Sequence, residues 1–322
     1  MTSKVASLST PEEQQVEAHT IWQIAFRRYR NHRMAVLGTF ILIGIFLFVT
    51  VGAMFYPEDA GNKTSFDREE PPGTIVNYRG DLGEVRVPLG TDGAGRNVLV
   101  RMIYGGQISL AIGVTSVIIS ITVGTVIGLI SGYFGGWVDA LLSRVTEIFL
   151  SVPPLILLLV LSSVLSEDTT TINFLGRELS RTVIYVVLLI GFTSWMRLSR
   201  IVRSQVLSLK EQEFVQAARA IGVRDFAIVF RHLMPNIIAP VVVAATLGIG
   251  TAIITEAYLS FLGFGVQPPT ATWGNILNGA LDQVETQWWL WVSPGFFITS
   301  TVLAINFIGD GLRDALDPRS IQ

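Results

Sequence analysis

Six long apolar runs constrain this 322-residue chain more than any other feature of its sequence. A helix rises about 1.5 Å per residue, so about 17–25 apolar residues cross the hydrocarbon core of a bilayer. Half of the residues are hydrophobic and only 15% are charged, which is rare in soluble domains. The sequence therefore predicts an all-α integral membrane protein with six transmembrane helices. The runs cover roughly residues 34–55, 109–130, 148–165, 183–198, 237–262 and 288–308.

The basic residues between the runs predict the orientation of the chain. They cluster before the first run, between the fourth and fifth runs, and after the sixth, whereas residues 263–287 contain no Lys or Arg. Because basic connections remain in the cytoplasm, both termini and the 199–236 loop are expected there. The predicted segments are a cytoplasmic tail with an interfacial helix (1–33), a first transmembrane helix (34–56), an extracytoplasmic segment (57–107), a five-helix core (108–308) that contains the 199–236 loop, and a cytoplasmic tail (309–322).

Small residues mark a close helix contact in the second run. Gly124, Gly128 and Gly132 lie four residues apart and form one smooth stripe on a helix. The stripe predicts packing against another helix, either within the chain or in a partner. The glycines of 131–138 (SGYFGGWV) predict a tight turn after it.

The sequence lacks the common zinc-binding and phosphate-binding motifs. The chain has no cysteine, and its three histidines form no H-E-x-x-H zinc motif. None of its three lysines follows a glycine as a phosphate-binding loop requires. The glycines of 89–101 (LGTDGAGRNVLVR) fit neither glycine-loop pattern, so we expect a folded external turn, with a short strand pair near 85–87. No catalytic residue, metal site or cofactor is predicted, and a net charge of −2 gives no indication of nucleic acid.

Glu256 is the one ionisable residue placed clearly inside an apolar run. A charge at mid-bilayer costs about 2.5–3.5 kcal/mol on insertion scales, so such a side chain usually faces protein or water. Two interpretations remain open. Glu256 lines a transport pathway or gate, or it is hydrogen-bonded near the outer end of its helix and packs against a neighbour.

The loop between the fourth and fifth runs contains a distinctive segment, 213–236 (EFVQAARAIGVRDFAIVFRHLMPN). Its apolar residues recur at helical spacing on both sides of Gly222, which permits a sharp change of direction. Asp225 is expected to cap a second short helix and Pro235 to end it. The first helix presents small alanines and the second an aromatic stripe, which favours docking to a cytoplasmic partner over a simple contact with lipid headgroups.

This segment resembles the cytoplasmic loop of binding-protein-dependent ABC importer permeases, whose pattern is E-A-A-x3-G-x9-I-x-L-P. The chain matches it at Ala217, Ala218, Gly222 and Pro235. The departures are Gln216, His232 and Met234. The stretches 89–110 (LGTDGAGRNVLVRMIYGGQISL), 132–139 (GYFGGWVD), 256–265 (EAYLSFLGFG) and 306–318 (NFIGDGLRDALDP) are similar to the second permease subunit of the oligopeptide/dipeptide/nickel branch.

The resemblance implies a type I ABC importer permease fold in a prokaryotic plasma (inner) membrane. It implies a homologous second permease, two cytoplasmic ATPases that bind ATP and Mg²⁺, and an extracytoplasmic solute-binding protein, all within surrounding lipid. Peptides are the commonest cargo of the branch, and nickel or another small solute is the alternative. The positions implied for coupling to an ATPase are Gln216, Ala217, Ala218, Gly222, Asp225 and Phe226.

Two other classes of membrane protein remain as alternatives. An ion-coupled secondary transporter usually shows internal repeats and charges near mid-membrane, but no convincing repeat is present and Glu256 stands alone. A membrane enzyme would need a nucleophile with its base or a metal site, which the histidine inventory argues against. The sequence therefore favours a transporter subunit that is not itself an enzyme.

Overall fold

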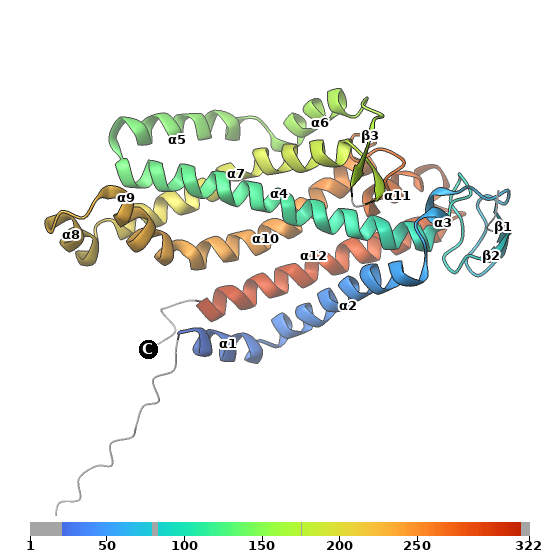
Figure 1. Ribbon diagram of the computed structural model, residues 1–322, viewed down its shortest axis with the longest axis horizontal. Coiled ribbons are helices and arrows are strands. Elements are labelled where there is room, and N and C mark those ends of the chain that lie inside the picture. The colour runs from blue at the N-terminus through green and yellow to red at the C-terminus, as the bar shows by residue number, and fades with distance from the viewer. Residues whose placement is uncertain (1–20, 79–82, 175, 317–322) are drawn as a thin grey trace, which may run out of the picture.

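The computed structural model describes residues 21–78, 83–174 and 176–316, and its long helices run side by side along one axis (Figure 1). Residues 1–20 and 317–322 of the two predicted tails lie outside the described residues. The long helices are α2 (Arg33–Phe55), α4 (Val98–Phe134), α5 (Gly136–Ser151), α6 (Pro154–Leu165), α7 (Thr182–Leu209), α10 (Met234–Phe261) and α12 (Trp288–Leu316). The short helices are α1 (Ile21–Asn31), α3 (Asp59–Asn62), α8 (Glu213–Ala220), α9 (Asp225–Ala227), the π-helical η1 (Ile228–Leu233), α11 (Trp273–Asn278) and the 3-10 turn η2 (Leu281–Gln283).

Five helical segments among the described residues are long and apolar enough to cross a membrane, and a broken pair makes up to six. The five are α2, α4, α7, α10 together with α9 and η1, and α12. The broken pair is α5 and α6, which bend by 79° relative to each other. The apolar run predicted over 148–165 crosses this bend, so the third predicted span is a broken one. Pro153 and Pro154 lack amide protons, and Val152 adopts the extended backbone that a following proline favours.

The glycine stripe of α4 packs against α7 of the same chain. A Cβ atom at Gly124 would lie 2.8 Å from the Trp195 carbonyl oxygen, and one at Gly128 would lie 2.6 Å from Val202 Cβ. One at Gly132 would lie 2.8 Å from Val206 Cβ. Only residues without a side chain allow the two backbones this close approach, so the contact left open by the sequence is internal.

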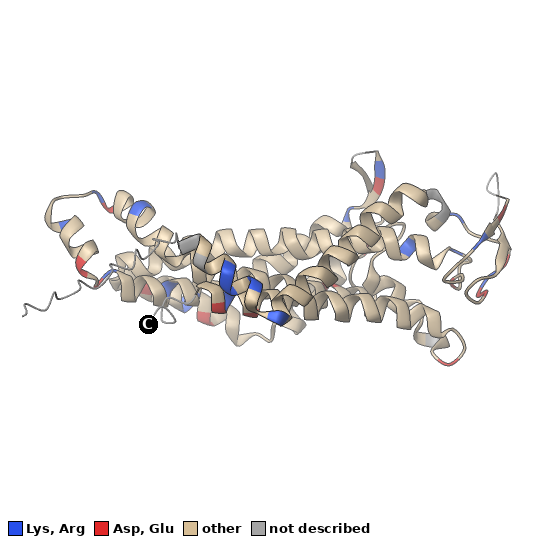
Figure 2. Ribbon diagram, turned by 90° about the horizontal axis from the view of Figure 1, so that it is seen from below, with Lys and Arg blue, Asp and Glu red and all other residues tan. Residues whose placement is uncertain are grey.

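The two ends of the bundle differ in structure. One end carries α1, α8 and α9, and the other carries two antiparallel strand pairs (Figure 1). The pairs are β1 (Ile75–Asn77) with β2 (Glu84–Arg86), and β3 (Thr171–Phe174) with β4 (Arg177–Ser180). The charged residues lie mostly on the half of the molecule that carries α8 and α9 and at the opposite end, and a stretch of the helices between these regions is almost free of them (Figure 2). We call the end with α8 and α9 the elbow end, and the end with the two strand pairs the lobe end.

The lobe end includes the strand pair and the external turn that the sequence predicted. The Asp92 carboxylate closes the turn by accepting hydrogen bonds from the backbone amides of Ala94 and Arg96, at 3.0 and 2.9 Å. Val76, Tyr78 and Val87 form a small core beneath it, and burial together with the nearby Asp92 raises the pKa of Tyr78 to about 12. Helix α4 begins at Val98, within the segment 57–107 that is predicted to lie outside the membrane.

An ion pair ties the β3–β4 hairpin to the rest of the lobe end. The Arg177 guanidinium donates to both carboxylate oxygens of Glu58, at 2.7 and 2.8 Å, and to Gln107 Oε1 at 2.8 Å. At the base of the hairpin, hydrogen bonds from Thr170 and Tyr185 lower the pKa of Asp168 to about 2. The hairpin is therefore held against α4 and the start of α3.

Candidate coupling site

The segment 211–233, which we call the elbow, projects from the bundle between α7 and α10 (Figure 1). Four of its apolar side chains are buried and pack with the ends of α4, α7 and α10: Val215, Ala218, Ile228 and Leu233. Burial of an apolar side chain contributes about 1.5–3 kcal/mol for a residue the size of valine or leucine. The elbow is therefore fixed to the end of the bundle by an apolar core that it shares with α4, α7 and α10.

Gly222 makes the turn between the two arms of the elbow. Its amide donates to the Arg219 carbonyl at 2.9 Å, and the amide of Val223 donates to the Ala218 carbonyl at 3.0 Å. These two bonds form a Schellman motif, which ends a helix with a residue of positive φ. Gly222 has a φ of 80°, which costs other L-residues about 1–2 kcal/mol, while the space around it is open.

The end of α4 fastens the elbow. The Tyr133 hydroxyl donates to the Asp225 carboxylate, and the Arg219 guanidinium lies 5.0 Å from the centre of the Tyr133 ring. Lys210 Nζ donates to the Gly132 carbonyl at 3.1 Å. Asp225 makes no capping bond to a backbone amide, so its predicted role as a helix cap is wrong. The tyrosine hydroxyl takes the carboxylate instead.

Pro235 does not end the second arm. It lies in the first turn of α10, where a missing amide is tolerated, and α9, η1 and α10 together form one segment, Asp225–Phe261. The π-helical turn η1 directly precedes this proline. Its wider hydrogen bonds, such as Met234 N to the Val229 carbonyl, carry the helix past the residue without a donor. The second arm is thus continuous with a membrane-spanning helix.

The predicted coupling residues divide into exposed and buried positions. Ala218 is only 6% exposed and faces the core of the elbow, whereas Phe226 is 74% exposed. Gln216, Ala217, Gly222 and Asp225 are also exposed. Five of the six positions are therefore available to a partner, and Ala218 supports them from beneath.

Two large apolar residues belong to the same exposed surface and are missing from the predicted set. Ile221 is 81% exposed, and Phe230 stacks on Phe226 with ring centroids 4.4 Å apart. The sequence contained a signal for Ile221. A large apolar residue directly before a turn glycine lies at the end of a helix, where few neighbouring side chains can bury it. We call Ala217, Ile221, Phe226 and Phe230 the docking surface.

Glu256 lies within α10 and is fully buried. Its two carboxylate oxygens accept hydrogen bonds from the hydroxyls of Ser260 and Ser109, at 2.8 and 2.9 Å. In the described parts of the chain, no group of three or more His, Asp or Glu side chains could hold a metal ion. The two hydroxyls that donate to the Glu256 carboxylate come from α10 itself (Ser260) and from α4 (Ser109).

Comparison with known proteins identifies the family. Residues 124–322 match the model of the binding-protein-dependent transport system inner membrane component, and residues 20–72 match the N-terminal TM domain of oligopeptide transport permease C. The chain is 39% identical to the oligopeptide transport system permease protein OppC of Haemophilus influenzae, over 96% of this chain and 92% of that protein. It is 38% identical to OppC of Escherichia coli, over 96% of this chain and 94% of that one.

A third relative, the dipeptide transport system permease protein DppC of Alkalihalophilus pseudofirmus, is 35% identical over 97% of this chain and 94% of its own length. The similarity thus covers the helical bundle, the elbow and the lobe end together. The chain belongs to the family of binding-protein-dependent transport system inner membrane components, and it is a membrane permease subunit of an ABC transport system, not an enzyme.

Proposed function

We propose that this permease carries peptides, delivered by an extracytoplasmic solute-binding protein, through a channel that it forms with a homologous second permease. Two ATPase subunits on the cytoplasmic side bind ATP and Mg²⁺ and supply the energy. The observation that carries the proposal is the docking surface. It is apolar and exposed, lies outside the bundle, and is joined to helices that cross the membrane.

The connection of the elbow to the bundle supports a role in coupling. One arm follows α7, and the other continues into α10 without a break. A movement of the ATPase that takes the docking surface with it therefore tilts both helices. ATP and substrate must bind the inward-open and outward-open states with different affinities, because a ligand with equal affinity for both shifts nothing.

The cargo is proposed from the relatives. The permeases with which the chain aligns over almost its whole length bear names that assign them to oligopeptide and dipeptide transport systems. A dipeptide or short oligopeptide is therefore the substrate class that we propose, with nickel or another small solute as the alternative.

Ile221 offers the sharpest test of coupling. Because its side chain is exposed, Ile221→Asp leaves the folded subunit intact and places a charge in the proposed contact with the ATPase. A charge left unpaired in such a contact costs several kcal/mol, so we expect ATP-driven uptake to fall at least tenfold with normal membrane insertion. Ile221→Met keeps an apolar side chain and is expected to retain uptake. Gly222→Glu should act in the same direction, with added backbone strain.

Normal uptake by Ile221→Asp would remove the coupling proposal. The cargo is tested separately in vesicles that contain the complete importer and its binding protein, with labelled dipeptide, labelled tripeptide and Ni²⁺ offered in turn. Uptake of Ni²⁺ without peptide, or uptake that survives ATP depletion and collapses with the ion gradient, would contradict the proposed function.

A further inference from the structure

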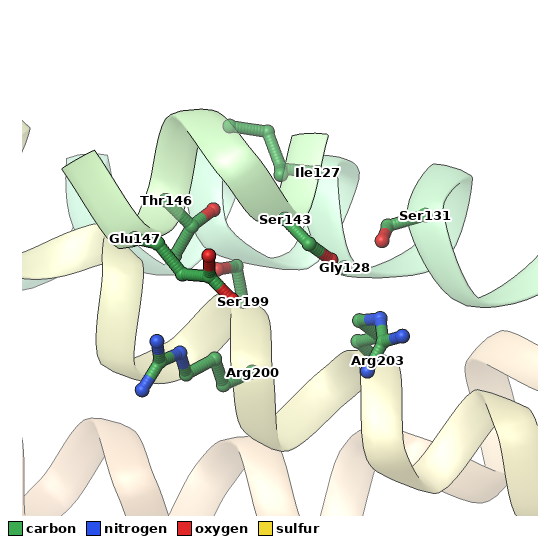
Figure 3. Close-up of a pocket in the computed structure, with 9 residues that line it drawn as sticks. All are labelled: Ile127, Gly128, Ser131, Ser143, Thr146, Glu147, Ser199, Arg200 and Arg203. Atoms are coloured by element: carbon green, nitrogen blue, oxygen red, sulfur yellow. The ribbon is translucent and has the colours of Figure 1, made fainter. Parts of the chain in front are cut away.

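A polar cavity of about 280 Å³ lies between α4, α5 and α7, on the elbow side of the α5–α6 bend (Figure 3). Four hydroxyl groups line it, from Ser131, Ser143, Thr146 and Ser199. Drug-sized sites occupy about 300–1,000 Å³, so this cavity suits a small ligand. Each hydroxyl already donates its proton within the protein: Thr146 to the Leu142 carbonyl, Ser199 to the Met196 carbonyl, and Ser131 and Ser143 to Asp139. The hydroxyl oxygens keep lone pairs that can accept a hydrogen bond from an amide N–H of a ligand.

Three charged side chains line the cavity, and one of them, Arg203, is neutralised by the neighbouring Asp139. Arg203 donates to both oxygens of the Asp139 carboxylate, at 2.5 and 2.6 Å, and Ser131 and Ser143 donate to the same carboxylate. This cluster joins α4, α5 and α7, and the Asp139 carboxylate and the Arg203 guanidinium at its centre are already hydrogen-bonded to each other. It has little remaining capacity to bind a charged ligand.

Glu147 and Arg200 are the charges that remain for a ligand. Their side chains lie on the same side of the cavity in Figure 3, one from α5 and the other from α7. Within the described residues, Arg200 makes no ion pair, and Glu147 has only an exposed contact with Arg144 at 3.4 Å. An exposed pair of this kind contributes about 0–1 kcal/mol, so Glu147 is readily available to a second cation.

We infer that this cavity holds a short peptide in transit by its two ends, with the α-carboxylate on Arg200 and the α-ammonium on Glu147. This inference rests on the proposed peptide cargo. Every linear peptide has these two ends whatever its side chains, and the hydroxyls are suited to the amide between them. A site that reads only the ends and the backbone is what a permease needs if it moves peptides of many sequences.

A phospholipid with an ethanolamine headgroup also has one positive and one negative group. It has no amide N–H between them that could donate to the hydroxyl oxygens of the lining. The peptide therefore accounts for more of the cavity than the lipid does, and the lipid becomes an outcome of the test.

The absence of cysteine from the chain allows the test to be made by thiol labelling. Ser143→Cys places one thiol in the cavity, and Ser204→Cys places one on the exposed surface of α7, outside it. The complete importer is placed in nanodiscs of phosphatidylglycerol only, and the rate of maleimide labelling of this subunit is measured. We expect alanyl-alanine to slow labelling at Ser143→Cys and to leave Ser204→Cys unaffected.

Capped peptides and charge variants separate the two ends. N-acetylated alanyl-alanine and alanyl-alanine amide should each need about tenfold higher concentration for the same protection, because each lacks one charged hydrogen bond. Arg200→Gln should abolish the preference for a free carboxylate, and Glu147→Gln the preference for a free amine. Arg197→Gln, an exposed change on α7 outside the cavity, should alter neither.

Equal protection by free and capped peptides would overturn the inference, as would protection only after phosphatidylethanolamine is added. Uptake of alanyl-alanine by the unmodified importer is measured in parallel. Uptake of alanyl-alanine without protection of Ser143→Cys would contradict the cavity assignment alone. No uptake of any peptide would contradict the proposed function itself.

Discussion

Two serine hydroxyls link the Glu256 carboxylate to the backbone amides of Val266 and Trp273. Ser260 Oγ donates to one carboxylate oxygen and accepts from the Val266 amide at 3.1 Å. Ser109 Oγ donates to the other and accepts from the Trp273 amide at 3.2 Å. The carboxylate therefore orients the hydroxyls that hold the start of α11 and the loop before it.

We expect Glu256→Leu to destabilise the subunit, because it leaves two buried hydroxyls without an acceptor at about 1–3 kcal/mol each. Glu256→Gln keeps the shape and one acceptor, so its loss should be smaller, and uptake per folded molecule should remain near normal. Thermal unfolding and vesicle uptake measure the two effects, with the exposed Thr251→Val as the control. A stable Glu256→Gln subunit that no longer transports would instead assign this residue to the pathway.

The contact between α4 and α7 leaves no room for a side chain at Gly128. A Cβ atom at Gly128 would lie 2.6 Å from Val202 Cβ and 2.7 Å from the Ser199 carbonyl oxygen, both inside contact distance. Neither neighbour is the end of a flexible side chain, so the two helices would have to separate. The same contact forms a wall of the polar cavity.

Gly128→Ala should therefore destabilise the subunit by about 1–3 kcal/mol through overpacking. Gly44→Ala is the matched control, because it is also a helical glycine but has no neighbour within 4 Å of the added methyl group. Alanine is favoured over glycine in a helix by up to about 1 kcal/mol, so the control should be neutral or stabilising. The melting temperature should fall for Gly128→Ala and stay the same or rise for Gly44→Ala. A Gly128→Ala subunit that melts no lower than the unmutated one would contradict the packing argument.

The sequence predicted most of the bundle because each span has a strong apolar signal and the glycines mark where helices touch. It could not predict the angle between α5 and α6, since the apolar run continues through Pro153 and hydropathy carries no information on the direction of a helix. The role of Pro235 depended on context too. A proline is disfavoured in the interior of a helix, whereas in the first turn its missing amide proton costs nothing, and Pro235 lies in the first turn of α10 directly after a π-helical turn.

Side-chain burial at the elbow was the other part that periodicity could not predict. Ala217 and Ala218 are adjacent in the sequence, and only the position of α8 against α7 and α10 decides which of them faces inward. Asp225 has the residue type of a helix cap, but Tyr133, far away in the sequence, competes for its carboxylate. Both outcomes depend on tertiary contacts.

Across the whole molecule, one helical segment links the elbow to the lobe end. Asp225–Phe261 contains 37 residues, which span about 55 Å at about 1.5 Å per residue. It begins beside the docking surface and carries Glu256 near its far end. A tilt produced at the elbow therefore reaches the segment before α11 through a rigid element.

That direction of transmission requires the elbow to be cytoplasmic, which a labelling experiment on the cysteine-free chain can measure. Glu211→Cys places a thiol on the exposed elbow, and Glu84→Cys places one on the exposed strand β2 of the lobe end. Because basic connections stay inside, a membrane-impermeant maleimide added to spheroplasts should label Glu84→Cys and reach Glu211→Cys only after permeabilisation. The unmutated chain should take no label in either condition. Labelling of Glu211→Cys in sealed spheroplasts would place the elbow outside, where no ATP-hydrolysing subunit could move it.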